Sequence, residues 1–535
     1  MLAPLEIRGR PAAPGLARGP RFRIGAPASM PHGARTGADA GAEGLAGAIA
    51  LSLSQVEALI AASEGAEADI LEFQAAMLAD DTLSDSAYAI LQKGGDASAA
   101  WNEALSAEIV GYLASEDDYF RARAADIADI RDRVLRNLSG AALEAPPPGS
   151  ILVGDDISPT RFLEADWSSG GGLALAGGSA ASHVAILARS RGVPMVVGLG
   201  PALLQESDEI IVDGESGTVV LRPGSAEAAA FEARREAAAT RAHLIRLRLH
   251  DQACSSDGVP IKVMVNIAGT DDLDRIDVAT CDGVGLMRTE FLFGGGKLPD
   301  EEEQFRVYAR VLEWAKGRPV TIRTIDAGGD KPVKGLTVAE TNPFLGIRGI
   351  RLSLARPEIF SVQLRALARA APLGDLKVML PMVSVPEEIS AASKLLDAAV
   401  ADAAFAHHAA IRPQLGIMVE VPAVAVTPEL FGEAAFFSIG SNDLIQYVMA
   451  AARDNPELSH LQGGLPLAVE RLIATVAAYG SENGIDVSLC GDAASDPAIV
   501  PRLLKAGLRS LSVAPAMLGA VKAAIAEVSI GHADG

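Results

Sequence analysis

The sequence predicts a multidomain α/β protein that ends in a (β/α)8 TIM barrel. The chain has 535 residues, more than one hydrophobic core usually organises, so two or three domains are expected. Residues 36–140 are rich in Ala, Leu, Glu and Asp, with apolar residues at helical spacing, which predicts a helical bundle. After residue 252, short apolar runs alternate with helical segments up to the end of the chain, as expected for a barrel of this class.

A helical domain is expected over residues 26–143. Ile70, Phe73 and Met77 have the spacing of one face of a helix. The three prolines at 146–148 end the helical region, because consecutive prolines exclude helix and hold the residue before each of them in an extended conformation. Helical hairpins are therefore expected up to this point, and a new unit after it.

A small α/β domain is expected on both sides of this helical insertion, from residues 1–25 and 144–223. Its short apolar runs alternate with glycine-containing turns and one short helix, and its first strand is expected from within residues 5–25. Residues 224–252 contain strong helix formers, with no glycine or proline after the start, which predicts a connecting helix. The barrel then takes up residues 253–535.

The ends of the predicted barrel strands carry polar and charged residues. The strands are expected at residues 261–267, 284–287, 320–325, 378–382, 415–419, 436–439, 487–490 and 510–513. The active site of a TIM barrel is built from the C-terminal ends of its strands, so the residues there are the candidates for chemistry. They are Asn266, Arg288, Arg323, Asp326, Met382, Glu420, Asn442, Asp443 and Cys490.

The positively charged residues of this group indicate an anionic substrate. Arg288, Arg323 and Arg348 suit a multiply charged oxyanion, because guanidinium groups bind phosphate and carboxylate through two parallel hydrogen bonds. Lys331 adds a further positive charge. Any one of these side chains, taken alone, is as consistent with an ordinary surface charge. Their joint position at one rim favours a site for a small phosphorylated acid.

Two carboxylates and a thiol belong to the same rim. Glu420 and Asp443 follow neighbouring strands, an arrangement that suits Mg²⁺ held by one or two carboxylates together with substrate oxygens. Cys490 stands at a strand end beside Gly491 and Asp492. A cysteine in such a position is either a buried small apolar residue or a catalytic group, and the sequence alone leaves both interpretations open.

A separate candidate, His183, lies where glycines give way to a hydroxyl residue and then to a helical pattern, in the segment that begins Gly177-Gly-Ser-Ala-Ala-Ser-His. This pattern predicts the N-terminus of a helix. Free N–H groups and the positive end of the helix dipole stabilise a phosphate there and disfavour the imidazolium form, which keeps a neutral ring nitrogen available as a nucleophile. A structural histidine at a helix start is the alternative.

The composition excludes several classes of protein. A net charge of −22 argues against a non-specific binder of nucleic acids or anionic membranes. The three cysteines are odd in number and widely spaced, which suits neither a disulfide framework nor a four-ligand zinc site. No uncharged apolar run approaches the roughly 18 residues of a membrane helix, and the first residues lack the apolar segment of a signal peptide. A cytoplasmic location is therefore expected.

Over nearly its whole length, the chain resembles Enzyme I of the bacterial phosphoenolpyruvate:sugar phosphotransferase system. In the N-terminal half, the resemblance is carried by Gly9-Arg-Pro-Ala-Ala-Pro-Gly, Arg123-Ala-Ala-Asp-Ile and Ser182-His-Val-Ala-Ile-Leu-Ala-Arg. In the barrel, it is carried by Gly283-Val-Gly-Leu-Met-Arg-Thr-Glu-Phe-Leu, Arg323-Thr-Ile-Asp-Ala-Gly-Gly-Asp-Lys, Asn342-Pro-Phe-Leu-Gly-Ile-Arg, Gly416-Ile-Met-Val-Glu-Val-Pro, Gly440-Ser-Asn-Asp-Leu-Ile-Gln-Tyr and Leu489-Cys-Gly-Asp.

The resemblance implies a phosphoenolpyruvate-protein phosphotransferase and a role for each candidate residue. His183 would be phosphorylated at its tele nitrogen, and Cys490 would protonate the enolate that remains when the phosphoryl group leaves. Glu420 and Asp443 would bind Mg²⁺. The substrate phosphoenolpyruvate would be bound by Arg288, Arg323, Arg348, Asn442 and Arg453, with Lys331 as a further positive charge.

The resemblance also implies partners. The acceptor is the phosphocarrier protein HPr, which docks on the helical domain through a basic face, and the barrel forms a homodimer. Residues 64–116 carry many carboxylates and a single basic residue, Lys93, and Asp80 and Asp81 are the expected acidic contacts.

Three positions differ from the usual family pattern, namely Ala181, Ala452 and Asp492, and they leave a catalytically weakened regulatory paralogue as an alternative. A second alternative is an ATP-linked pyruvate phosphotransferase, which needs an additional nucleotide-binding domain. Only about 140 residues precede the expected histidine domain, and they contain no glycine-rich nucleotide loop.

Overall fold

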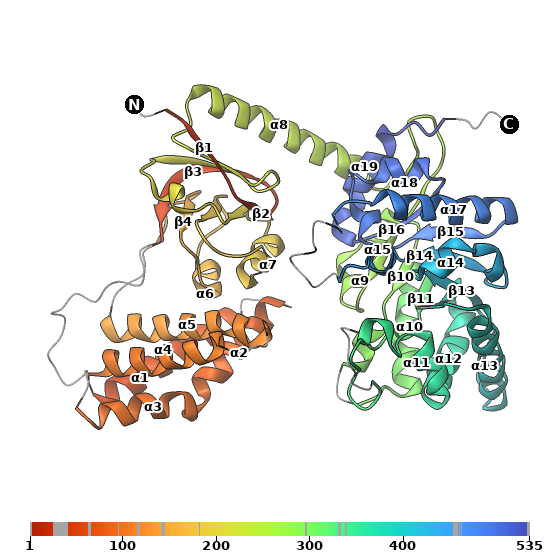
Figure 1. Cartoon of the computed structure of the whole chain (residues 1–535), viewed down its shortest axis with the longest axis horizontal. Helices are drawn as coiled ribbons and strands as arrows, with labels where there is room; N and C mark the ends of the chain where they lie inside the picture. Colours follow the sequence, from red (N-terminus) through yellow and green to blue (C-terminus); the bar gives the residue numbers. More distant parts are fainter. Residues whose placement is uncertain are drawn as a thin grey trace. The chain divides into compact units, whose positions relative to one another are not determined.

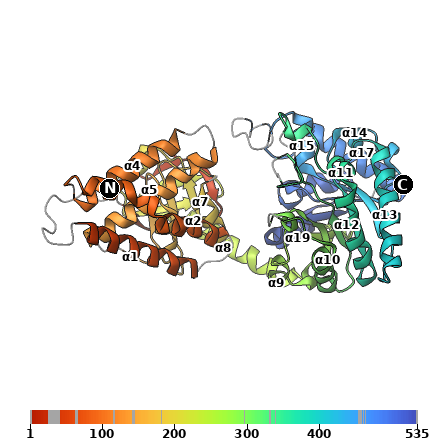
Figure 2. The same ribbon diagram turned by 90° about the horizontal axis from the view of Figure 1, so that it is seen from below.

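The computed structural model describes residues 3–24, 41–61, 66–94, 96–114, 118–140, 145–180, 182–294, 297–329, 333–337, 340–452, 458, 461 and 463–531. The chain forms two compact units, Met1–Ala239 and Thr240–Gly535 (Figures 1 and 2). Helix α8 (Ser225–Arg248) contains the boundary between them. Its sequence is rich in Ala, Glu and Arg, residues with high helix propensity, as the sequence analysis expects of a connecting helix.

The first unit is built on one mixed sheet in the order β1-β8-β7-β3-β4-β5-β6-β2. Strand β3 connects the two parts of this sheet, because it pairs with β4 in parallel and with β7 in antiparallel orientation. The strands are β1 (Leu5–Arg8), β2 (Arg10–Ala13), β3 (Leu16–Arg23), β4 (Ile151–Gly154), β5 (Gly172–Leu175), β6 (Met195–Val197), β7 (Glu209–Asp213) and β8 (Thr218–Leu221).

The N-terminal segment therefore supplies three strands to this sheet, where the sequence analysis expects one. Tight turns between short strands leave too few apolar residues for a clear alternating pattern. Gly19 of β3 is required by packing, because a Cβ there would lie 1.9 Å from the carbonyl oxygen of Gly149. The two ends of the helical insertion thus return to adjacent positions of the sheet.

The insertion is a bundle of five helices in the described part of the chain, as Figure 1 shows in orange. These are α1 (Ala42–Ala61), α2 (Ala66–Ala79), α3 (Asp81–Leu91), α4 (Ala97–Leu113) and α5 (Asp118–Ser139). Two shorter helices, α6 (Pro159–Leu163) and α7 (His183–Ser190), lie between the bundle and the sheet. One hydrophobic core continues from Trp101 and Ile127 in the bundle to Phe162 and Leu187 in these helices.

Helix α1 is the one described helix long and apolar enough to cross a membrane by length and composition. Such a helix also occurs in the core of helical bundles. Leu45, Ala48, Ser52 and Val56 of α1 are buried, and α1 packs against α2 and α5. The burial of this face is consistent with a bundle helix.

The second unit is a closed barrel of eight parallel strands, which confirms the predicted fold class. The predicted runs all form strands, although β11 ends at Arg323, two residues before the expected end, and β12 begins two residues earlier than expected. The strands are β9 (Lys262–Ile267), β10 (Val284–Met287), β11 (Val320–Arg323), β12 (Leu376–Leu380), β13 (Gln414–Val419), β14 (Phe436–Ile439), β15 (Asp486–Leu489) and β16 (Ser510–Val513).

Helices surround this barrel on the outside, as Figure 2 shows. Helix α10 starts with a capping box between Asp300 and Glu303. The helices are α9 (Asp272–Arg275), α10 (Glu301–Ala315), α11 (Ile350–Ala355), α12 (Pro357–Ala370), α13 (Pro386–Phe405), α14 (Pro422–Val426), α15 (Ser441–Met449), α17 (Leu467–Asn483), α18 (Val500–Lys505) and α19 (Leu518–Glu527).

Side chains alternate along the strands between the helical layer and the barrel interior. The large core lies between strands and helices and includes Val263, Val265 and Ile267 of β9. A second, smaller apolar cluster fills the interior; it consists of Leu286, Met379, Met418, Phe436 and Cys490. This interior layer excludes water from below the strand ends, where the polar groups gather.

Candidate active site

The centre of the barrel mouth is a buried pair of arginines that share one carboxylate. Asp326 follows β11 and accepts two hydrogen bonds from Arg348, Nε to Oδ1 at 3.2 Å and Nη2 to Oδ2 at 2.9 Å. Arg323 Nη1 lies 3.3 Å from the same Oδ2 atom. All three side chains are buried, and the adjacent carboxylates raise the pKa of both arginines despite the opposing effect of burial. Both guanidinium groups therefore stay charged in a site of low polarity.

Arg348 also connects this pair to helix α15. Its Nη1 atom lies 3.2 Å from Asp443 Oδ1 and 3.3 Å from the hydroxyl of Tyr447, which in turn donates a 2.6 Å hydrogen bond to the carbonyl of Phe344. Each of the three guanidinium nitrogens of Arg348 thus has a protein partner. In this arrangement Arg348 orients Asp326 and Asp443; its direct contact with a substrate stays a prediction.

Arg323 is less completely paired. Its Nη2 donates to Glu290 Oε1 at 3.0 Å, and the same oxygen accepts the Asp326 N–H at 3.1 Å. Arg323 Nε is buried and has no hydrogen-bond partner among the described residues. A buried N–H group without a partner is costly, so it indicates a ligand oxygen or water at this point. Arg323 is accordingly the arginine best prepared to bind an anion.

Glu420 is the most unusual carboxylate at this rim. It is buried, and its Oε1 atom accepts the N–H of Met382 at 2.6 Å. Met382 has a φ of +59°, a strained left-handed conformation for this residue, and this turns its N–H toward the carboxylate. Burial, with the charges of Asp443 and Asp326, raises the pKa of Glu420 to about 8. Two buried carboxylates that repel each other in this way form a suitable environment for a cation.

The thiol of Cys490 lies at the top of the apolar interior. Its side chain is buried, and Sγ lies 3.6 Å from the carbonyl oxygen of Ile439. Burial raises the pKa of Cys490 to about 11, against the lowering effects of Ser438 and Arg323. The group is therefore a neutral thiol at physiological pH, able to donate a proton. Gly491 follows it, because a Cβ there would lie 1.9 Å from Ser441 Oγ.

The remaining predicted site residues lie around this centre. Arg288 is exposed at the end of β10, and its guanidinium has no hydrogen bond or ion pair to the described residues. The Asn442 side-chain oxygen accepts the N–H of Asp492 at 2.8 Å, so the amide nitrogen is the part of this side chain that is left to bind a ligand. Lys331 and Arg453 lie outside the residues that the structure describes.

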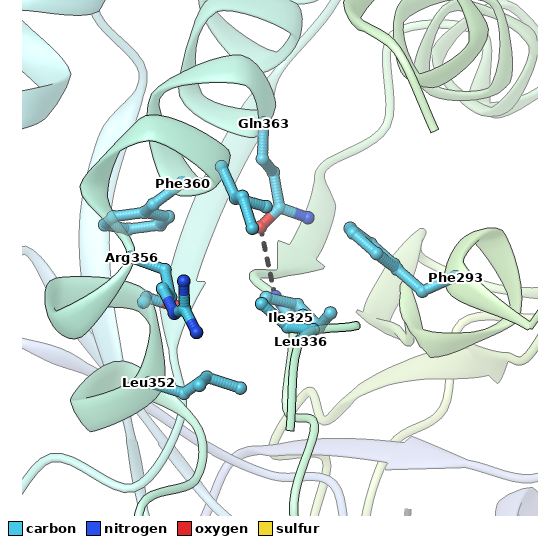
Figure 3. Close-up of a pocket in the computed structure, with 9 residues that line it drawn as sticks. Phe293, Ile325, Leu336, Leu352, Arg356, Phe360 and Gln363 are labelled. Carbon is cyan, nitrogen blue, oxygen red and sulfur yellow. Dashed lines mark hydrogen bonds between the residues drawn. The ribbon is translucent and has the colours of Figure 1, made fainter. Parts of the chain in front are cut away.

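A buried glutamine supports the cluster from outside the barrel. Gln363 Oε1 accepts the N–H of Ile325 at 3.1 Å, the dashed line in Figure 3, and its Nε2 lies 3.3 Å from Thr289 Oγ1. Thr289 donates to the carbonyl of Arg323 at 3.0 Å. The apolar void beside Gln363, lined by Phe293, Leu336 and Phe360 among others, is only about 10 Å³, room for roughly one water molecule. Gln363 therefore stabilises the loop after β11, and the void beside it is too small to be a substrate pocket.

His183 is the first residue of α7, as the sequence pattern predicts. Ser182 caps this helix by accepting the N–H of Ala185 at 3.3 Å. The imidazole is partly exposed, and its Nδ1 atom lies 3.5 Å from Asp126 Oδ1 of α5. The other ring nitrogen, Nε2, has no hydrogen bond to the described residues. His183 and the barrel rim belong to different units of the chain.

Comparison with known proteins identifies the family. Three domain descriptions match in order: the N-terminal domain of PEP-utilising enzymes over residues 8–123, the mobile domain over 146–217 and the PEP-binding domain over 244–530. A phosphoenolpyruvate-protein phosphotransferase of Haloferax volcanii is 39% identical over 480 residues, 87% of this chain and 83% of that protein. The chain belongs to the phosphoenolpyruvate-protein phosphotransferase family. One of Geobacillus stearothermophilus is 38% identical over 421 residues, 75% of this chain and 71% of that protein.

Membership in the phosphoenolpyruvate-protein phosphotransferase family confirms the resemblance to Enzyme I. Sequence reasoning assigned no role to Glu290, Tyr447, Gln363 or Asp126, although the structure places Glu290, Tyr447 and Asp126 against predicted site residues and Gln363 against Thr289, which donates to Arg323. Glu290, Tyr447 and Asp126 stand inside the sequence motifs that carry the resemblance, which is the signal that could have found them. Gln363 lies outside those motifs, on a helix behind the barrel wall.

Of the two predicted acceptor contacts in this phosphotransferase family member, the structure describes the side chain of Asp80 alone. Asp80 caps α3, since its Oδ1 atom accepts the Thr82 N–H at 2.9 Å and the Thr82 hydroxyl at 2.7 Å. These hydrogen bonds lower the pKa of Asp80. Asp80 thus has a structural task besides any contact with a partner. The side chain of Asp81 lies outside the described part of the structure.

Proposed function

We propose that this chain transfers the phosphoryl group of phosphoenolpyruvate to His183 and then to a histidine of an HPr-like phosphocarrier, releasing pyruvate, as the first step of a sugar phosphotransferase system. The observation that carries the proposal is the presence of two arginines, the buried Arg323 and the exposed Arg288, at neighbouring strand ends of the barrel mouth. Arg323 presents a buried Nε–H without a described partner, and the exposed Arg288 stands at the neighbouring strand end. Paired guanidinium groups of this kind bind a small, highly charged oxyanion.

The first half-reaction follows from these groups. The lone pair of His183 Nε2 attacks the phosphorus, so an N–P bond forms while the P–O bond to the enol carbon breaks. The activation barrier comes mainly from aligning the reacting atoms and from the negative charge on the transferred phosphoryl group. Arg288 and Arg323 neutralise this charge. The pyruvate enolate then takes a proton at C3 from the Cys490 thiol. Its pKa of about 11 keeps this acid protonated beforehand, and water returns the proton afterwards.

Mg²⁺ is the cofactor that the carboxylates of this rim fit. Glu420 and Asp443 are both buried, and the charge of Asp443 adds to burial in raising the pKa of Glu420, so a cation near both carboxylates would be stabilised. Carboxylate oxygens are the ligands that Mg²⁺ prefers. When bound, the ion supplies charge neutralisation and orientation of the substrate oxygens. Among the described residues, no three His, Cys, Asp or Glu side chains are arranged so that they could hold a metal ion by themselves, so in this proposal substrate oxygens and water complete the coordination.

The parts of the chain have separate tasks in this proposal. Residues 1–25 and 144–223 carry the phosphorylated histidine, residues 26–143 receive the phosphocarrier and residues 224–252 link these parts to the barrel. The barrel, residues 253–535, binds phosphoenolpyruvate and forms the homodimer. Support comes from the separate matches to the N-terminal, mobile and PEP-binding domains. The whole reaction takes place in the cytoplasm.

Incubation with ³²P-labelled phosphoenolpyruvate and Mg²⁺ tests this function. We expect one acid-labile, base-stable label that His183→Ala abolishes, and transfer of that label to an added HPr-like protein. Label from [γ-³²P]ATP would instead indicate the ATP-linked alternative. A folded wild-type protein that accepts no label from either donor would indicate a regulatory paralogue.

A further inference from the structure

Helix α5 presents a line of buried polar residues to α6 and α7. Asp129 accepts the Thr160 N–H at 3.2 Å and the Thr160 hydroxyl at 2.8 Å, and Gln74 donates to it at 3.1 Å. One turn further, Arg133 pairs with Glu164 and with Gln55. The contacts to Thr160 and Glu164 hold α5 against α6, which in turn packs against α7, the helix that begins at His183.

Asp126 lies one turn before Asp129 on the same face. It is fully buried, and its Oδ1 atom is 3.5 Å from His183 Nδ1. This separation is longer than a good hydrogen bond, as is common for catalytic pairs before the substrate is bound. The contact uses Nδ1, and Nε2 has no hydrogen bond to the described residues.

We propose that Asp126 is a positioning residue for the phosphoryl transfer, because its carboxylate accepts Nδ1–H of His183 and holds the ring in the tautomer whose free lone pair is on Nε2. This inference rests on the proposed function and adds the group that selects the reacting nitrogen. The hydrogen bond made by one ring nitrogen of a histidine determines which nitrogen carries the proton. An aspartate behind a catalytic histidine acts in this way in other enzymes, where it also stabilises the imidazolium form.

The same contact balances charge through the reaction cycle. When Nε2 forms its bond to phosphorus, the proton stays on Nδ1 and the ring becomes a cation, which the Asp126 carboxylate stabilises at short range. When the N–P bond breaks during transfer to the acceptor, the electron pair returns to Nε2 and the ring is neutral again. Neither step requires a proton to leave or enter the ring. A protonated ring is also the better leaving group, so the contact favours the second transfer.

The test compares three variants of the full chain labelled with ¹⁵N histidine. In the wild-type protein, ¹⁵N chemical shifts should report a neutral His183 with the proton on Nδ1. Asp126→Asn keeps an oxygen acceptor and should retain this tautomer, whereas Asp126→Ala should shift the population toward Nε2–H. The matched control is Asp132→Asn on the same helix, because Asp132 accepts its hydrogen bond from the neighbouring Arg131 at 2.8 Å and its replacement should leave the His183 signals unchanged.

Transfer rates give the second measurement. We expect phosphorylation of His183 to slow by about 10- to 100-fold in Asp126→Ala, the usual cost of losing a partner that orients a functional histidine. Asp126→Asn should be intermediate, because it orients the ring without compensating its charge. A wild-type tautomer and rate in a folded Asp126→Ala protein would overturn the inference. The tautomer measurement needs no phosphoenolpyruvate, so it stands or fails separately from the proposed function.

Discussion

The guanidinium of Arg348 lies against both carboxylate oxygens of Asp326, with Nε 3.2 Å from Oδ1 and Nη2 2.9 Å from Oδ2. Both side chains are completely buried. The pair therefore cannot exchange its partners with water, and its geometry fixes Asp326 between Arg348 and Arg323. The free energy needed to remove two charges from water offsets much of the attraction between them. A buried pair of this kind therefore adds little to the stability of the fold, but it holds the side chains of the site in one arrangement.

Breaking this pair should affect both stability and activity. Arg348→Met leaves Asp443 buried without its cation and Asp326 with Arg323 alone, and we expect the barrel to lose about 3–5 kcal/mol of unfolding free energy. Arg348→Lys keeps the charge but loses the two-pronged geometry, so it should lower kcat more than stability. Calorimetry and steady-state kinetics measure the two effects. The control is Arg310→Met, whose exposed pair with Asp274 should contribute at most about 1 kcal/mol.

Removal of Mg²⁺ should destabilise the barrel mouth. Glu420 and Asp443 repel each other in a buried setting, so a bound ion should raise the melting temperature of the barrel relative to protein in EDTA. Glu420→Gln removes the repulsion and one ligand. We therefore expect this variant to melt higher than wild type in EDTA, to gain little from added Mg²⁺ and to lose most activity. An unchanged Mg²⁺ response in calorimetry would exclude Glu420 as a ligand.

The sequence was sufficient to predict the strand ends but not the contacts across them. Arg323, Glu420 and Cys490 could be placed at one rim because the carboxyl ends of parallel strands meet at one edge. The pairing of Arg348 with Asp443 joins a loop residue to a residue of α15 that is 95 positions away, and no local pattern encodes it. The contact between Asp126 and His183 depends on how α5 packs against α7, which helical spacing leaves undetermined. That residues 5–23 form three strands, where one was expected, was likewise hidden, because β1 and β2 have only four residues each and are too short to show a period.

Cys490 should react slowly with alkylating reagents at neutral pH. Its pKa of about 11 means that roughly one thiol in a thousand is ionised at pH 8, and the thiolate is the reactive form. Mass spectrometry after brief treatment with iodoacetamide should show labelling of Cys490 that rises about tenfold per pH unit from 7 to 10. Cys254, which is only half-buried, serves as the internal comparison for access of the reagent. Rapid labelling of Cys490 at pH 7 would mean that the thiol is ionised, and it would then be no proton donor.

Replacement of Cys490 by alanine should separate the two half-reactions. The thiol is needed only after the phosphoryl group has left phosphoenolpyruvate, to protonate the enolate. Cys490→Ala should therefore slow the release of pyruvate, while label already on His183 passes to the phosphocarrier at the wild-type rate. The two rates can be measured separately with isolated phosphoprotein. Loss of the second transfer in a folded variant would assign another role to Cys490.

The acidic surface of the helical domain should control the encounter with the phosphocarrier. Carboxylates predominate between residues 64 and 116, where Lys93 is the single basic residue, and a basic partner would be attracted to such a surface. Asp80 also caps α3, so its replacement by lysine would mix a stability loss of about 1 kcal/mol with the loss of charge. Asp80→Asn keeps a capping side chain and removes only the charge. We expect Asp80→Asn combined with Asp81→Lys to raise the apparent KM for the carrier and to leave pyruvate release unchanged. The effect should diminish as added salt screens charges over about 8 Å at physiological ionic strength. If the double variant phosphorylates the carrier normally at low salt, the carrier docks on another part of the chain.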